Sequence, residues 1–77
     1  MPHIEIKCYP GRTDAQKKQL ADKIAQDVAE IFKTEEGCVS VAIEDIPEQE
    51  WKERVWDRKI VPRQEFLYKK PEYDYND

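Results

Sequence analysis

Chemistry in this sequence begins at its second residue, where Pro2 follows Met1. A small residue at this position permits removal of Met1, which leaves Pro2 with a free secondary amine. An unperturbed terminal amine has a pKa of about 7.7 to 8.0, and burial or nearby cations lower it because they disfavour the charged form. Pro2 is therefore a candidate general base near neutral pH. The alternative is a proline that only begins a strand, where its missing N–H is harmless.

Histidine and cysteine are the next candidates for chemistry. His3 is the single histidine of the sequence, and Cys8 and Cys38 are its two cysteines, without CxxC spacing. Such a set predicts neither a disulfide framework nor a zinc site, so we expect no metal and two reduced, buried thiols. His3 lies beside the candidate base, but a lone histidine on an alternating strand is expected to be structural.

The elements that position these residues follow from the hydrophobic pattern. Residues 3–9 alternate, with Ile4, Ile6 and Cys8 on one face, which predicts a strand that ends at Pro10-Gly11. Thr13 and Gln16 have the spacing of a capping box, so a helix is predicted to begin at Asp14. Its apolar side carries residues at helical spacing, namely Leu20, Ile24, Val28 and Ile31.

A second strand completes a βαβ unit. Gly37 is the predicted stop of the helix, and residues 38–46 alternate again, with Val39, Val41 and Ile43 on one face. Strand, long helix and strand predict two parallel strands in an α+β fold. A lone parallel pair leaves a sheet face and both edges uncovered, so the protomer is expected to associate with a second copy.

The remainder is predicted to form short pieces. Residues 48–59 suggest a short helix, and residues 63–70 a further ordered piece, either helical or a strand against a partner subunit. Trp56 is expected in the core or at an interface. The tail from Pro71 is polar enough to be mobile unless the rings of its tyrosines dock.

The composition excludes several classes of function. The 77 residues carry a formal net charge of −4 with basic and acidic residues interspersed, which disfavours nucleic-acid binding. No apolar run approaches the roughly 20 residues of a membrane span, and the N-terminus lacks the features of a signal peptide. We therefore expect a cytoplasmic protein that binds neither nucleic acid nor membranes. A chain this short buries little surface, so self-association is the expected stabilising device.

Taken together, these features resemble the 4-oxalocrotonate tautomerase family. The likeness covers residues 2 to about 51 and rests on Pro2, on the turn Gly11-Arg12-Thr13-Asp14 with Gln16 and Lys17 beyond it, and on the Val-x-Val-x-Ile strand at residues 39–43. The opening Pro-His-Ile-Glu-Ile-Lys-Cys and the stretch after residue 60 are similar to a longer bacterial branch whose members form dimers rather than hexamers. The resemblance implies a homodimer in which two βαβ protomers form a four-stranded sheet covered by two helices, with no cofactor.

The resemblance also implies roles for individual residues. Pro2 would move a proton between the enol oxygen and a carbon atom of a 2-keto acid. Phenylenolpyruvate is a representative enol of this class. Arg12 would bind the substrate carboxylate through its guanidinium fork, and Trp51 would form an apolar wall of the pocket. Ser40 stands where the hexameric enzymes carry a second arginine. This departure favours a monocarboxylic keto acid, or recruitment of an arginine from the C-terminal stretch, namely Arg54, Arg58 or Arg63.

Plainer interpretations stay open beside these roles. Arg12 in a solvated turn and Trp51 in core packing are both compatible with the sequence. The alternative function is a catalytically silent dimeric βαβ module that contacts another protein. In either case we expect a single domain over residues 1–77, with a βαβ core at 2–46 and an extension at 47–77 that supplies pocket and dimer contacts.

Overall fold

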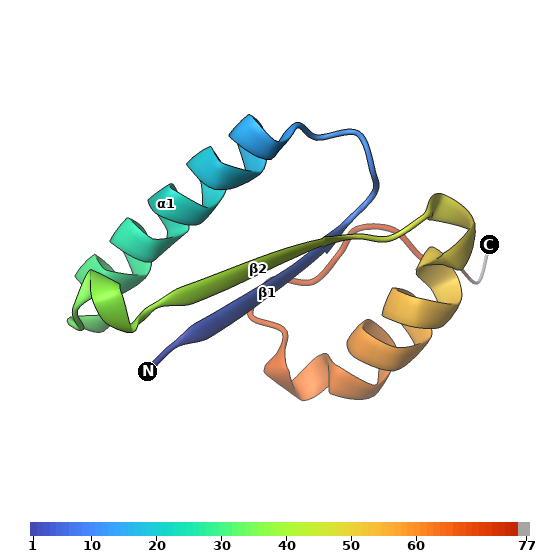
Figure 1. Ribbon diagram of the computed structural model, residues 1–77. Helices are drawn as coiled ribbons and strands as arrows, with labels where there is room; N and C mark the ends of the chain where they lie inside the picture. Colours follow the sequence, from blue (N-terminus) through green and yellow to red (C-terminus); the bar gives the residue numbers. More distant parts are fainter. Residues whose placement is uncertain (76–77) are drawn as a thin grey trace. The chain divides into compact units, whose positions relative to one another are not determined.

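The computed structural model describes residues 1–75, which divide into two compact units at the boundary between Asp45 and Ile46 (Figure 1). The first unit contains strand β1 (His3–Cys8), helix α1 (Asp14–Phe32), a 3₁₀ turn η1 (Glu36–Cys38) and strand β2 (Ser40–Asp45). This order confirms the predicted βαβ protomer. The division falls next to the expected start of the extension, and the assignment of both units to a single domain stays a prediction.

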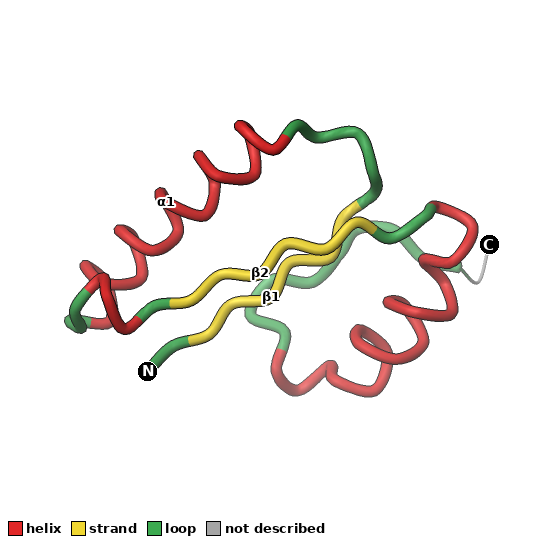
Figure 2. Tube along the Cα trace, in the orientation of Figure 1, coloured by secondary structure: helices red, strands yellow, loops and turns green. Residues whose placement is uncertain are grey.

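Strands β1 and β2 form a parallel two-stranded sheet, as Figure 2 shows. His3 pairs with Ser40, and Ile6 pairs with Ile43. Paired residues of parallel strands point to the same face, so the isoleucines share one face and the His3–Ser40 pair lies on the other. The alternation read from the sequence is therefore correct for both strands. Each strand is shorter than predicted: β1 ends at Cys8, and β2 begins only at Ser40, because η1 extends to Cys38.

Helix α1 begins as the sequence predicts. The Thr13 hydroxyl accepts from the Gln16 backbone N–H at 3.1 Å, and the Gln16 side-chain oxygen accepts from the Thr13 N–H at 2.8 Å. The helix end differs from the prediction, because Lys33 ends it in the left-handed region at φ 56° and its N–H bonds the Ala29 carbonyl. Gly37 instead lies within η1. The left-handed conformation strains a lysine modestly. The hydrogen bonds that the backbone N–H groups of Lys33 and Thr34 donate to the Ala29 carbonyl offset this strain.

The capping box supports a first test of the fold. We expect Thr13→Ala to lower the free energy of unfolding by about 1 kcal/mol, because the Gln16 backbone N–H loses the hydroxyl that accepts its hydrogen bond. Urea denaturation followed by far-UV circular dichroism measures the change. Thr34→Ala is the matched control, since Thr34 caps no helix. An equal loss in both variants would contradict the capping role.

The first unit has a thin interior. Helix α1 lies along one side of the strand pair (Figure 1), yet no side chain of residues 1–45 is fully buried. Near its C-terminal end α1 leaves Ile31 74% and Phe32 70% exposed. Two strands and one helix bury too little apolar surface to be stable alone. This unit therefore has the burial expected of a subunit in a larger assembly.

The second unit is built from short helical segments. A 3₁₀ turn η2 (Glu48–Glu50), a π-helical segment η3 (Lys52–Ile60) and a 3₁₀ segment η4 (Val61–Phe66) follow one another. The short helix expected over residues 48–59 is therefore present, with a wider hydrogen-bonding pattern than an α-helix. Val55 of η3 is only 4% exposed. Among residues 1–75, no helix is both long enough and apolar enough to cross a membrane.

The C-terminal tyrosines dock within this second unit. The rings of Tyr73 and Tyr75 lie 5.2 and 5.3 Å from the ring of Trp56, and the Trp51 indole N–H donates to the Tyr73 hydroxyl at 2.9 Å. Aromatic pairs at such distances contribute about 0.5 to 1.5 kcal/mol beyond the area they bury. The sequence predicted a mobile tail unless its tyrosine rings dock. The rings of Tyr73 and Tyr75 do dock, so the tail is ordered up to residue 75.

Candidate functional site

Pro2 is tied to the start of strand β2. Its carbonyl accepts a hydrogen bond from the Ser40 backbone N–H at 3.1 Å, and Pro2 itself is half-buried. This bond extends the β1–β2 ladder by one residue and fixes the backbone on which the candidate base is carried. The structure therefore brings together two of the predicted site residues, Pro2 and Ser40.

His3 adds a side-chain contact at the same place. Its Nδ1 lies 2.6 Å from the Ser40 hydroxyl oxygen, and its Nε2 lies 3.6 Å from a carboxylate oxygen of Glu5. The side chains of His3 and Glu5 are 53% and 57% exposed, so this polar cluster is open to a ligand. The sequence placed His3 on the correct face, but the contact with Ser40 depends on the strand register, which the sequence does not determine.

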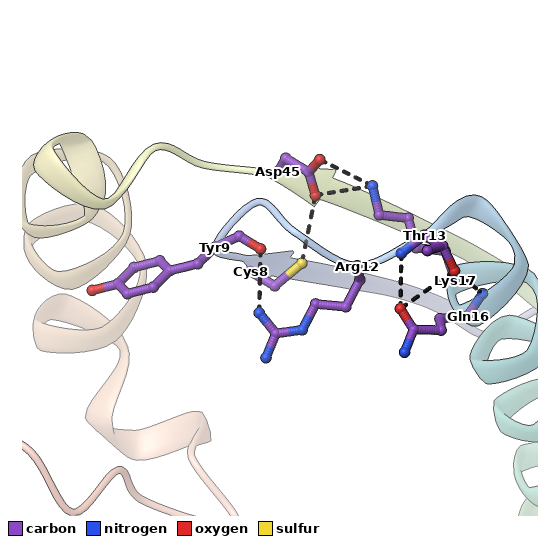
Figure 3. A network of polar contacts seen from close by, with 7 residues as sticks. All are labelled: Cys8, Tyr9, Arg12, Thr13, Gln16, Lys17 and Asp45. Carbon is purple, nitrogen blue, oxygen red and sulfur yellow. Dashed lines mark hydrogen bonds and ion pairs between the residues drawn. The ribbon is translucent and has the colours of Figure 1, made fainter.

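The turn after β1 presents Arg12. Gly11 adopts φ +125°, a backbone conformation that side chains rarely permit, and this turn reverses the chain into α1. The Arg12 Nη1 donates to the Tyr9 carbonyl at 3.4 Å, a long bond to a neutral acceptor (Figure 3). Because that carbonyl carries no net charge, the contact does not neutralise the guanidinium, which can still attract an anionic ligand.

Arg12 also lines a pocket between α1 and the sheet. The pocket has a volume of about 220 Å³. Its apolar lining comes from Ile6, Leu20 and Ile43, and its polar lining from Cys8, Arg12, Gln16 and Lys17. An apolar cleft beside a guanidinium suits a ligand with a hydrophobic body and one carboxylate.

Asp45 neutralises the second cation of this pocket. Lys17 Nζ lies 2.9 and 3.0 Å from the two carboxylate oxygens of Asp45, and the Cys8 thiol lies 3.8 Å from one of them (Figure 3). The hydrogen bond that the Lys17 ammonium donates to the Asp45 carboxylate raises the pKa of Lys17, so this ammonium stays charged at neutral pH. Sequence reasoning missed Asp45, although its phase with Val41 and Ile43 places it on the helix-facing side of β2.

Arg12 and Pro2 lie at opposite ends of β1. The strand contains six residues, and at roughly 3.3 Å per residue it separates its two ends by about 20 Å. Figure 1 shows the N-terminus at one end of β1 and the link to α1 at the other. The structure therefore does not bring Pro2 and Arg12 together within one protomer.

The remaining site candidates belong to the second unit. Trp51 is half-buried there and bonds Tyr73. Three arginines of this unit were candidates to replace the second arginine of the hexameric enzymes, and each has a partner nearby. Arg54 lies 3.0 Å from Glu50, and Arg58 lies 3.7 Å from Glu53. Arg63 lies over the ring of Phe66. Within the described part of the chain, histidine, cysteine and carboxylate side chains form no group of three that is placed to hold a metal ion.

Comparison with known proteins gives consistent matches. A family model described as tautomerase enzyme matches residues 2–56. Tautomerase PptA of Cronobacter sakazakii is 39% identical over 75 residues, which cover 96% of this chain and 99% of the relative. Tautomerase PptA of Enterobacter sp. strain 638 is 42% identical over 95% of this chain and 97% of the relative. The protein of the same name from Escherichia coli K12 is 38% identical over 99% of each chain.

Two solved structures match the fold. The crystal structure of apo unfused 4-OT aligns with a TM-score of 0.61 and 33% identity over 64% of this chain and 80% of that chain. YwhB, a homologue of 4-oxalocrotonate tautomerase, aligns with a TM-score of 0.59 and 34% identity over 61% of this chain and 77% of that chain. Both likenesses combine sequence identity above 30% with the same arrangement of elements.

Proposed function

The chain belongs to the 4-oxalocrotonate tautomerase family and is a tautomerase enzyme, and from this membership we propose that it ketonises enols of 2-keto acids without a cofactor, using the amine of Pro2 as its base. Met1 is 98% exposed, which favours its removal, and the Ser40 hydrogen bond holds the Pro2 backbone at the strand edge. A positioned base contributes about 100- to 10,000-fold to such a proton transfer. The tethered position of Pro2 is the single observation that carries this proposal.

The reaction needs one proton to move and one bond to shift. The neutral Pro2 amine accepts the enol O–H proton, the oxygen forms a carbonyl, and the carbon–carbon double bond takes up a proton at carbon 3 from the resulting ammonium. Pro2 returns to its neutral state, so no other reactant is consumed. A base that is neutral near cell pH and partly shielded from water suits both steps.

A homodimer supplies the rest of the proposed site. Since about 20 Å of strand separates Pro2 from Arg12 in one protomer, a site that uses both needs a second copy. Two strand pairs placed side by side in opposite directions bring the Pro2 end of one next to the Arg12 end of the other. Such an arrangement gives a four-stranded sheet with a helix from each copy, and the thin interior of residues 1–45 supports it.

The proposed substrate has one carboxylate and an apolar body. The contact of Arg12 with the Tyr9 carbonyl leaves the positive charge of the guanidinium in place. The charge of Lys17, in contrast, is neutralised by Asp45. The apolar lining beside Arg12 suits an aryl or alkyl group, as in phenylenolpyruvate. Trp51 is the proposed apolar wall that limits access of water.

Processing of the N-terminus tests the proposal directly. Protein with Met1 fully removed is expected to accelerate phenylenolpyruvate ketonisation, whereas protein made with methionine aminopeptidase inhibited is expected to be inactive, because Pro2 then carries an amide nitrogen without basicity. Intact mass identifies each form, and loss of enol absorbance gives the rate. Equal rates for both forms would exclude the amine as the base.

A further inference from the structure

The end of helix α1 leaves an aromatic ring in solvent. Phe32 is the last residue of α1 and is 70% exposed, and its neighbour Ile31 is 74% exposed. Phe32 stands four residues beyond Val28, so it continues the apolar stripe that begins at Leu20. We infer that Phe32 of the partner subunit closes the pocket beside Arg12 and sets the size of the apolar group that this pocket accepts. The inference rests on the proposed function and adds a residue of the second copy to its site.

The pocket is bounded differently on its two sides. Towards β2, Lys17 of the helix pairs with Asp45 of the strand at 2.9 Å, and this ion pair joins the two elements. Towards β1, the lining consists of Ile6 and Cys8, which offer an alkyl group and a small thiol. An apolar side chain of a second copy is therefore best received along β1.

The topology brings Phe32 to this pocket once two copies pair as proposed. A helix that connects two parallel strands runs opposite to both, so α1 ends at the Pro2 end of the unit and starts at the Arg12 end (Figure 1). Strand pairs side by side in opposite directions are related by a two-fold axis perpendicular to the sheet, which keeps both helices on one face. The Pro2 end of one copy then lies beside the Arg12 end of the other. The partner's Phe32 therefore lies beside the Arg12 pocket, on the face that the helices cover.

The charges of α1 favour the same antiparallel pairing of the two helices. Around the end of α1 acidic side chains outnumber basic ones, with Glu30, Glu35 and Glu36 against Lys33. The helix dipole adds partial negative charge at this end and partial positive charge at the start. Antiparallel pairing places the acidic end of one helix beside the positive start of the other, whereas parallel pairing would place two acidic ends together. Electrostatics therefore directs Phe32 towards the pocket of the second copy.

A ring at this position limits the size of the substrate. Within one copy the apolar lining comes from Ile6, Leu20 and Ile43, and Phe32 of the partner subunit adds a wall that the copy itself lacks. In an apolar pocket, a difference of one methylene group changes kcat/KM by about 10- to 200-fold. The side chain at residue 32 is therefore expected to decide which of two apolar groups of different size the enzyme prefers.

Cys8 permits a cross-linking test that needs no turnover. In a Cys38→Ser background, Phe32→Cys is expected to form a disulfide with Cys8 of the partner subunit when air and copper phenanthroline oxidise the two thiols. Residues 8 and 32 lie at opposite ends of one copy, so this disulfide has to join two chains. A non-reducing gel and the intact mass detect the covalent dimer.

Two variants serve as controls for the disulfide. Adding Cys8→Ser is expected to abolish the covalent dimer. Lys23→Cys in place of Phe32→Cys puts a thiol where a side chain of α1 is 68% exposed, and it should give no covalent dimer. A covalent dimer that survives Cys8→Ser, an equal yield from Lys23→Cys, or an assembled Phe32→Cys variant without the disulfide would overturn the inference.

A photo-reactive side chain covers the case in which Phe32→Cys does not assemble. p-Benzoylphenylalanine in place of Phe32 keeps an aromatic ring, and irradiation is expected to attach it to a peptide that contains Ile6 or Leu20. Pairing with isotope-labelled wild-type protein shows by mass that this peptide belongs to the second chain. Attachment within its own chain, or to residues 46–75 of the second chain, would overturn the inference.

Phe32→Leu tests the effect on specificity. Leucine keeps an apolar side chain but leaves more room, so kcat/KM for the enol of 2-naphthylpyruvate relative to phenylenolpyruvate is expected to rise about 10-fold. Phe66→Leu makes the same change at the other phenylalanine of the chain, which is 58% exposed, and should leave this ratio unchanged. An unchanged ratio in Phe32→Leu would contradict the role in specificity. The expected disulfide in a protein that ketonises neither enol would reject the proposed reaction and retain the inferred contact.

Discussion

Pro2→Ala is expected to reduce kcat for enol ketonisation by about 100- to 10,000-fold, the range that a positioned acid–base group supplies. Alanine at the N-terminus keeps a primary amine, but it lacks the ring that fixes the nitrogen at the strand edge. Because the Ser40 N–H bonds the carbonyl of residue 2 rather than its side chain, the fold should be preserved. Stopped-flow loss of enol absorbance measures the rate.

The control for this variant is structural. Far-UV circular dichroism and the elution volume on size exclusion should match those of wild type, since β1 itself starts at His3. A variant that is folded and retains at least half of the wild-type rate would remove Pro2 from the mechanism. A variant that unfolds is replaced in the test by wild-type protein with Met1 retained, which differs only in the basicity of the nitrogen.

Arg12→Gln is expected to lower kcat/KM for a monocarboxylic enol by about 10- to 100-fold, because a charge-assisted hydrogen bond contributes about 1.5 to 3 kcal/mol. Glutamine keeps part of the length and loses the charge and the fork. Arg12→Lys should recover part of the loss, since a point charge replaces bidentate geometry. Lys18→Gln makes the same change in net charge on the exposed side of α1, where Lys18 pairs with Asp22, and should leave kcat/KM unchanged.

Mixing the two impaired variants tests whether each site is shared between two copies. Pro2→Ala and Arg12→Gln are unfolded together and refolded at equal concentrations. If each site combines Pro2 of one copy with Arg12 of another, random pairing restores about a quarter of the wild-type sites. If both residues act within one copy, the mixture should be no more active than the average of its two components. The 20 Å estimate for the length of β1 favours the first outcome.

Local signals explain which parts of the fold were predictable. The start of α1 depends on Thr13 and Gln16, three residues apart, so its capping box was visible in the sequence and is confirmed. The end of α1 was not visible in the sequence. Lys33 ends the helix in a left-handed conformation, which is normally expected of a glycine, and the stop was therefore predicted at Gly37. The π-helical form of η3 likewise depends on packing of the second unit, which the apolar spacing over residues 48–59 does not encode.

Contacts between distant residues explain what could be predicted of the site. Pro2, Arg12, Ser40 and Trp51 are predicted as site residues from residue type and from a family resemblance, and these roles stay predictions. The sequence alone did not indicate that Ser40 meets His3, because that contact needs the parallel register of residues 37 positions apart. The separation of Pro2 from Arg12, by contrast, follows from the length of β1, and the strand predicted over residues 3–9 already implies it.

The thin interior of residues 1–45 has a consequence for how this enzyme behaves at low concentration. If a second copy covers this βαβ unit, as in the proposed dimer, folding and assembly form one linked equilibrium. By mass action, we then expect dilution to shift that equilibrium towards monomers that are both unfolded and catalytically incompetent. Midpoints of thermal denaturation and specific activities therefore acquire meaning only together with the protein concentration at which they were obtained.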